Sequence, residues 1–354
     1  DPIVLYDKAA DRWLLTQFAV TQAPFSQCIA VSTSADPTGT YARYEYQFQD
    51  FNDYPKFGVW PDAYYGTFNM FRGNNFLGAK ACAFERDKMQ ASQGARMVCF
   101  DVANQGGLLP ADVDGATLPS SGTPNYTLNI GSNQLNLWKF HVDWTNPGSS
   151  TFTGPTPVKT APFEIACRTS SNPGQCVKQP RTAETLDTLS DRLMFRLAYR
   201  KFSDHEALVV NHAVVAGSSS GVRWYELRDP GGTPKIFQQG TYAPDAAFRW
   251  MGSIAMDKTG NMLIGYSVSS PQIFPAIRFT GRSVTDPVNQ MAMEQQGVPG
   301  KGSQLTPERW GDYASMSIDP SDDCTFWFST QYASTTGKFN WSTSIVPVKF
   351  TSCH

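Results

Sequence analysis

Acidic and basic residues stand at the start of several apolar segments that the sequence predicts as strands. Carboxylates that face one another can act as general acid and general base on a glycosidic bond, one with its pKa raised by its neighbour. Arginine can hold a substrate carboxylate through two parallel hydrogen bonds, as an acidic sugar requires. We therefore expect catalytic carboxylates at Asp53, Asp191 and Asp312, and substrate-binding cations at Lys56, Arg192, Arg249 and Arg309.

The same residues admit a structural role. Aspartate and arginine side chains can pair with each other or with backbone amides and so hold neighbouring sheets together. Calcium is a further prediction, because Asp1, Asp53 and Asp312 would supply hard oxygen ligands together with backbone carbonyls. No loop has the EF-hand spacing, and the segment DPSDD at 319–323 is better explained as a hairpin turn.

Other function classes lack their signatures. The formal net charge is -2 and no long basic or acidic run occurs, which argues against nucleic acid and anionic membranes as partners. No apolar stretch reaches the roughly 18 residues that a membrane helix needs, so we expect no membrane insertion. GxSxG, HExxH, P-loop and GxGxxG motifs in their required contexts are absent.

The seven cysteines show neither CxxC spacing nor a Cys/His cluster, which favours disulfides over zinc. We predict disulfides that join Cys82 to Cys99, Cys167 to Cys176 and Cys324 to Cys353. Cys28 is left over. It either pairs with a cysteine outside the visible sequence, on a missing N-terminal segment or a partner chain, or it is a buried reduced thiol. Disulfides predict a secreted or cell-surface protein.

The elements that position these residues are predicted to be strands throughout, with a helix pattern only near Thr182–Leu189. Short runs rich in β-branched and aromatic residues alternate with turns. An apolar strand, an aspartate, a polar turn and a second strand recur about every 52 to 62 residues, with one longer interval. The repeated aspartates are Asp7, Asp62, Asp114, Asp204, Asp257 and Asp319.

This repeat predicts an all-β fold, a β-propeller of four-stranded blades with six visible and seven in the intact protein. A large sandwich or two β domains are the alternatives. We expect one domain over 1–354, with a disulfide-bearing insertion at about 145–186. The predicted blades are 1–50, 51–103, 104–165, 186–245, 246–300 and 305–353.

Several segments carry a resemblance to secreted, largely uncharacterised bacterial propeller proteins. They include DPIVLYDKAADRWLLTQFAV at 1–20, DYPKFGVWPDAYYGTFNMF at 53–71 and WGDYASMSIDPSDDCTFWF at 310–328. The resemblance covers nearly the whole chain and implies an upstream segment with a further blade and cysteine, but no known reaction. Residues 34–41 are distantly similar to the Asp-box turn of sialidase-like and arabinanase-like propellers, from which no catalytic residue is carried over.

Loops that lead into the innermost strands of a propeller converge at its channel mouth. We therefore expect an extracellular domain that binds a glycan at this mouth, with cleavage as a glycoside hydrolase or polysaccharide lyase as an open extension. The alternative is a noncatalytic adhesion or assembly module of a larger surface or secreted protein.

Overall fold

The computed structural model describes residues 1–168 and 173–354, which form strands and turns with one short helix, α1 (Arg86–Gln90), and one 3-10 turn, η1 (Pro147–Ser149). The chain is therefore all-β, as predicted. Contacts between Cα atoms divide it into two compact units, Asp1–Asn129 with Leu135–Pro157, and Ile130–Gln134 with Val158–His354. The single closed ring of six or seven blades stays a prediction.

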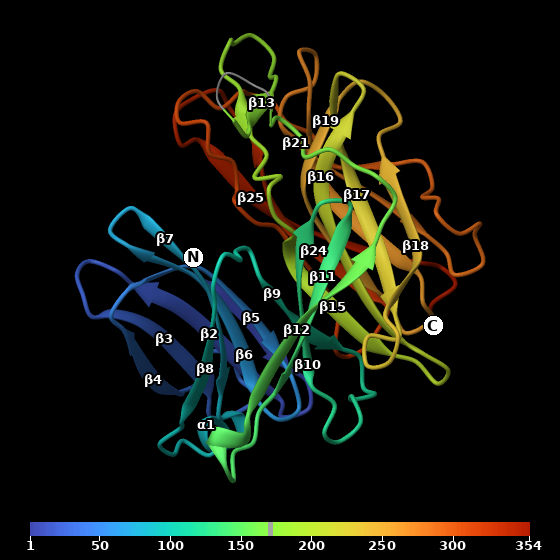
Figure 1. The fold of residues 1–354 in the computed structure, drawn as a ribbon. Coiled ribbons are helices and arrows are strands. Elements are labelled where there is room, and N and C mark those ends of the chain that lie inside the picture. Colours follow the sequence, from blue (N-terminus) through green and yellow to red (C-terminus); the bar gives the residue numbers. More distant parts are fainter. Residues whose placement is uncertain (169–172) are drawn as a thin grey trace. The chain divides into compact units, whose positions relative to one another are not determined.

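The first unit contains three groups of four antiparallel strands, each hydrogen-bonded in chain order (Figure 1, blue to green). The first group is β1 (Ile3–Asp7), β2 (Arg12–Ala19), β3 (Phe25–Ser32) and β4 (Tyr41–Phe48). The second is β5 (Phe51–Val59), β6 (Tyr64–Arg72), β7 (Asn75–Phe84) and β8 (Met97–Val102). The third is β9 (Leu109–Asp114), β10 (Asn125–Gly131), β11 (Gln134–His141) and β12 (Thr151–Lys159).

Strand β5 contacts both β1 and β9, the first strands of the neighbouring groups. It is buried from Tyr54 to Val59, as expected of a strand covered on both faces. Gly58 permits the close approach of β9, because a Cβ atom there would lie 2.3 Å from the carbonyl oxygen of Ala111. The up-and-down order and the packing of first strands are those of propeller blades.

The second unit repeats this plan. Its strands are β15 (Met194–Lys201), β16 (Glu206–Ala216), β17 (Ser219–Arg228) and β18 (Lys235–Tyr242), then β19 (Phe248–Met256), β20 (Met262–Ser269), β21 (Ala276–Arg282) and β22 (Gln295–Val298). A last sheet has three strands rather than the expected four, β23 (Ser315–Ile318), β24 (Thr325–Ala333) and β25 (Trp341–Lys349). Between β12 and β15 lie the paired β13 (Gln175–Val177) and β14 (Leu186–Asp187), so the expected helix at Thr182–Leu189 is wrong.

Strand β19 is buried along its whole length and contacts β15, β16, β17 and β23. Ile254 of β19 belongs to a core cluster that also includes Tyr266 and Phe328. Gly265 of β20 leaves room for this packing, because a Cβ there would lie 2.3 Å from the Phe328 ring. The core of this unit is therefore built on the first strand of its central sheet.

Two first strands, β5 and β19, and the segment before β23 contain a similar backbone irregularity. Tyr54 and Met251 have φ angles of 54° and 49° at register shifts in β5 and β19, and Asp312, just before β23, has a φ of 56°. This left-handed conformation is unfavourable for residues with a Cβ atom and persists only where the surroundings impose it. The predicted site residues Asp53 and Arg249 lie within two positions of this strained backbone.

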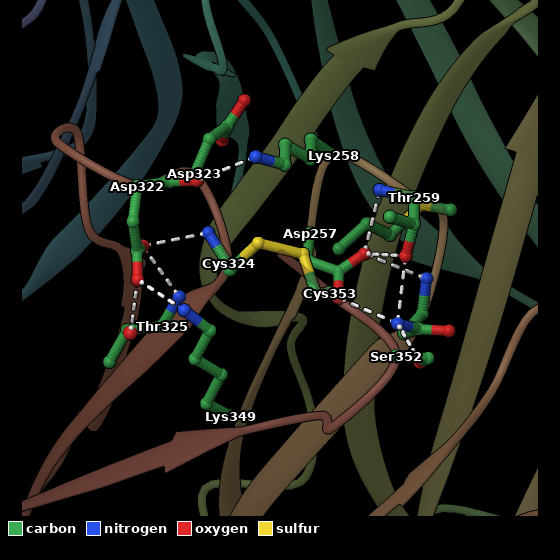
Figure 2. Close-up of a disulfide and its surroundings, with 12 residues drawn as sticks. Asp257, Lys258, Thr259, Asp322, Asp323, Cys324, Thr325, Lys349, Ser352 and Cys353 are labelled. Atoms are coloured by element: carbon green, nitrogen blue, oxygen red, sulfur yellow. Dashed lines mark hydrogen bonds and ion pairs between the residues drawn. A yellow bond between two sulfur atoms is a disulfide. The ribbon is translucent and has the colours of Figure 1, made fainter.

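Each repeated aspartate lies at the end of the first strand of a sheet or in the turn that follows. Asp257 accepts hydrogen bonds from the backbone amides of Thr259 (2.9 Å) and Asn261 (3.0 Å). In the β23–β24 turn, Asp319 accepts from the amide of Ser321 at 2.8 Å, and Asp322, which is not one of the repeated aspartates, accepts from the amides of Cys324 and Thr325, both at 2.9 Å. Figure 2 shows both clusters beside the disulfide Cys324–Cys353, which ties the chain after β25 to the start of β24.

The three predicted disulfides, Cys82–Cys99, Cys167–Cys176 and Cys324–Cys353, are confirmed. Cys82 and Cys99 are direct partners in the β7–β8 register. Cys28 is half-buried in β3 and has no disulfide partner in the part of the chain that the structure describes. Burial raises the pKa of its thiol, and the nearby Glu45 carboxylate acts in the same direction.

Arg200 joins the turns of the second unit. Its Nη2 and Nη1 donate to the two carboxylate oxygens of Asp323 at 2.7 and 3.0 Å, and its Nε donates to the carbonyl of Met256 at 3.0 Å. The Arg200 side chain is 6% exposed. One guanidinium thus links β15 to the ends of β19 and to the β23–β24 turn.

We expect Arg200→Ala to lower the free energy of unfolding by about 3 kcal/mol, because it leaves a largely buried carboxylate unpaired. Urea denaturation followed by tryptophan fluorescence measures this loss. The control is Arg72→Ala, since Arg72 pairs with Asp50 but is 73% exposed, and should cost less than about 1 kcal/mol. Equal losses for the two variants would contradict the assignment.

Asp62, in the β5–β6 turn, gives a pH-dependent test. Burial raises the pKa of its carboxyl to about 6, although Tyr65 donates a hydrogen bond to it at 3.1 Å. The folded chain therefore holds a proton that the unfolded chain releases near pH 4, and stability falls as pH rises from about 4 to 6.

Asp62→Asn should remove this part of the pH dependence and should be more stable than the wild type above pH 7, because Asn accepts the same hydrogen bond without a charge. Thermal melts across pH 4 to 8 measure it. Asp101→Asn, at a side chain that is 80% exposed, should keep the wild-type slope. An Asp62→Asn profile parallel to the wild type would show that this carboxyl is not buried.

Candidate functional site

The first unit contains three of the predicted site residues. Lys56 is fully buried in β5; its Nζ donates to the carbonyl of Pro55 at 2.8 Å and lies 3.7 Å from the centre of the Tyr54 ring. Asp53 is half-buried opposite Asn69 of β6, and Asp1 precedes β1. The ammonium group of Lys56 is thus engaged inside the unit, and its role in substrate binding stays a prediction.

The second unit pairs its predicted residues with one another. Arg192 donates through Nε and Nη2 to the carboxylate of its neighbour Asp191, at 2.7 and 2.9 Å. Arg309 donates in the same way to Asp312, with Nε at 3.1 Å from Oδ1. This hydrogen bond raises the pKa of Arg309 above its usual value. Both pairs are those expected of the structural alternative.

Arg249, like Lys56, is fully enclosed, with a side chain that is 0% exposed. It donates to Asp245 (Nη1, 2.8 Å) and to Glu294 (Nη2, 2.8 Å; Nε, 2.9 Å). Burial favours the neutral acid at Glu294, but hydrogen bonds from Arg249 and Tyr266 outweigh it and lower the pKa of this carboxyl. Arg249 therefore holds two carboxylates in place, and its role in substrate binding stays a prediction.

No group of three or more His, Cys, Asp or Glu side chains within 1–168 and 173–354 is arranged to hold a metal ion. Asp1 and Asp53 belong to the first unit and Asp312 to the second. Calcium at these residues stays a prediction.

A hollow of about 670 Å³ in the second unit contains Asp191, whereas Asp53 and Asp312 do not line it. We name it the insertion hollow, because most of its wall comes from the segment between β12 and β15. Its lining is Ile130, Gly131, Ser132, Asn133, Phe163, Glu164, Ile165, Cys167, Arg168, Asp191 and Val215.

Backbone contacts hold this wall in place. The amide of Val215 donates to the carbonyl of Glu164 at 2.8 Å, and Ile165 forms an antiparallel bridge with Val214 of β16. Asn133 accepts through its side-chain oxygen from the amide of Phe163 at 2.9 Å. Cys167 of the disulfide Cys167–Cys176 also lines the hollow, and residues 169–172 of the predicted disulfide loop lie outside the described residues.

The aromatic part of the hollow rests on a buried histidine. The ring of Phe163 meets His212 edge-on with 4.7 Å between the ring centres, and Nε2 of His212 lies 3.0 Å from the hydroxyl of Tyr225. Burial lowers the pKa of His212 to about 3, and the nearby Arg223 acts in the same direction. His212 is therefore neutral at physiological pH and supports the Phe163 ring.

The insertion hollow combines the carboxylates of Glu164 and Asp191 and the guanidinium of Arg168 with the apolar surfaces of Phe163 and Val215. Polar groups that can donate and accept beside apolar patches suit a ligand with hydroxyl groups and hydrophobic ring faces. Sequence reasoning found Asp191 but missed the other four. The long interval between Asp114 and Asp204 indicated an insertion in this region. It did not indicate which residues of the insertion line a cavity.

The chain matches no family model and no curated protein. Solved structures similar to it include an endo-arabinase from Bacteroides thetaiotaomicron, with a TM-score of 0.40 and 10% identity over 99% of this chain and 94% of that chain. An α-L-arabinofuranosidase from Lactobacillus brevis has a TM-score of 0.38 and 10% identity, over 99% of this chain and 90% of that chain. A protein of unknown function from Dyadobacter fermentans has a TM-score of 0.38 and 12% identity, over 94% of this chain and 74% of that chain. These values identify no family for the chain.

Proposed function

We propose that this protein binds a glycan in the insertion hollow. The observation that carries the proposal is the joint placement of Glu164, Arg168 and Asp191 with Phe163 and Val215 around one hollow of about 670 Å³. A sugar offers hydroxyl groups to the charged side chains and C–H faces to the apolar ones. The size of the hollow is within the range of small-molecule sites in proteins.

The cellular setting that we propose is extracellular. Three disulfides fit an extracellular protein, because such bonds persist in oxidising compartments. Among the described residues, no helix has the length and apolar character to cross a membrane. Glycans are abundant ligands in that setting, and cleavage would be a further activity of the same carboxylates.

A noncatalytic assembly module is the second candidate, and the last sheet favours it. Along β24 and β25, Trp327, Trp341 and Ile345 are 39, 44 and 64% exposed, and the neighbouring Phe339 is 65% exposed. An apolar surface of this kind is typical of protein interfaces. A chain that binds a protein through this face and binds no glycan would support this candidate.

A glycan array with neutral and uronic-acid-containing chains, followed by calorimetry on the best ligand, tests the first proposal. Asp191→Asn and Arg168→Ala should each weaken binding about tenfold or more, which is the scale of losing a hydrogen bond to a charged group. Release of reducing ends from the same ligand reports cleavage.

The matched control is Asp204→Asn. Asp204 lies in the turn after β15 whereas Asp191 lies before β15, and its side chain is 77% exposed, so binding should be unchanged. If no glycan on the array binds, or if binding survives in both hollow variants, the proposal is wrong.

A further inference from the structure

A second hollow of about 450 Å³ is lined in part by the β16–β17 turn. Val215, near the end of β16, lines the insertion hollow, and Ser218, in the turn itself, lines the second hollow. We name the latter the hairpin hollow. Its lining is Lys178, Ser218, Asp245, Ala246, Ala247, Phe248, Ser270, Pro271, Gln272 and Ile273.

Both hollows belong to the second unit, and two segments of the chain contribute lining residues to each of them. The first segment is the end of β16 with the β16–β17 turn, where Ala216 pairs with Ser219 across Gly217 and Ser218. The turn is open to solvent, because its two residues are small and exposed and a Cβ atom at Gly217 would meet nothing within 4 Å. A chain molecule in one hollow can therefore pass over the turn into the other.

The second segment is the disulfide Cys167–Cys176 with the residues described beside it. Arg168 follows the first cysteine and lines the insertion hollow, and Lys178 stands two residues after the second cysteine and lines the hairpin hollow. The hydroxyl of Ser269 donates to the carbonyl of Lys178 at 2.9 Å and anchors that side to β20. One crosslink thus positions one cation at each hollow.

The hairpin hollow repeats the chemistry of the insertion hollow. Asp245 is 52% exposed, and it is oriented by Arg249 and by the amide of Ala247 at 2.8 Å. The Lys178 ammonium and the Gln272 amide supply donors, and Phe248 and Pro271 supply apolar surface. Ligand groups that suit the first hollow therefore suit the second.

The charges indicate what kind of glycan fits. Asp191 and Asp245 are each already neutralised by an arginine, Arg192 and Arg249, and Glu164 adds a further carboxylate at the insertion hollow. Arg168 and Lys178 form no ion pair with any of the residues described at 1–168 and 173–354, so Lys178 is an available cation at the hairpin hollow and Arg168 is one at the insertion hollow, where Glu164 also lies. Spaced cations of this kind bind a chain that carries repeated carboxylates.

We infer that the two hollows bind consecutive parts of one linear acidic glycan, which crosses the β16–β17 turn and offers a uronic-acid carboxylate to Arg168 on one side and to Lys178 on the other. This inference rests on the proposed function and extends it to a ligand class and a second binding position.

Calorimetry with galacturonate, alginate and hyaluronan oligosaccharides tests it, each at two and at eight sugar residues. At least one eight-residue chain should bind about tenfold more tightly than its two-residue form, because only the longer chain reaches both cations. Lys178→Ala should remove most of this gain and leave two-residue binding within about twofold.

Ser218→Trp, which adds a bulky side chain to the β16–β17 turn, should also lose the gain from chain length. Lys235→Ala is the control, because Lys235 is an exposed lysine at the opposite end of the same sheet, at the start of β18. The inference is overturned if affinity does not depend on length, if Lys178→Ala and Ser218→Trp bind like the wild type, or if none of the acidic chains binds. If a neutral glycan binds in a way that depends on Asp191, and no acidic chain binds, the inference is overturned while the proposed function stands. Absence of any glycan binding would overturn both.

Discussion

Burial of β5 and β19 on both faces is the constraint on which the rest of this structure depends. Each is the first strand of the central sheet in its unit, and each contacts the first strands of the neighbouring sheets. A polar group on such a strand must find a partner inside the protein or its burial is costly. The Lys56 ammonium group contacts the Tyr54 ring and the Pro55 carbonyl. The Arg249 guanidinium pairs with Asp245 and Glu294.

The same constraint explains which side chains remain available to bind a ligand. Most charged residues near the first strands form ion pairs with one another, as Arg309 does with Asp312. The side chains that remain available lie on the segment between β12 and β15 and on the β16–β17 turn, which are loops held by backbone bonds and a disulfide. Binding residues on loops above a rigid scaffold are a general arrangement in proteins.

Sequence patterns predicted the strands and disulfides well, because alternation, turn aspartates and cysteine spacing are local signals. Asp257 shows this, since its hydrogen bonds stay within four residues of the chain. The helix α1 was missed because five residues are too few for a periodic pattern. The helix predicted at Thr182–Leu189 was wrong because part of this segment forms β14, which pairs with β13. Glu164 and Arg168 could not be predicted, because the hollow that they line is formed by β16 and the β10–β11 turn, which are distant in sequence.

Amide hydrogen exchange of the whole chain, followed by mass spectrometry of its peptides, tests the burial of the first strands most directly. Opening β5 or β19 requires the neighbouring sheets to separate, so their amides should exchange only on global unfolding, well after those of β4 and β25, which have alternating exposed residues. If β5 and β19 exchange as fast as β4 and β25, the central strands are not enclosed, and the account of the paired charges and of the hollows is wrong.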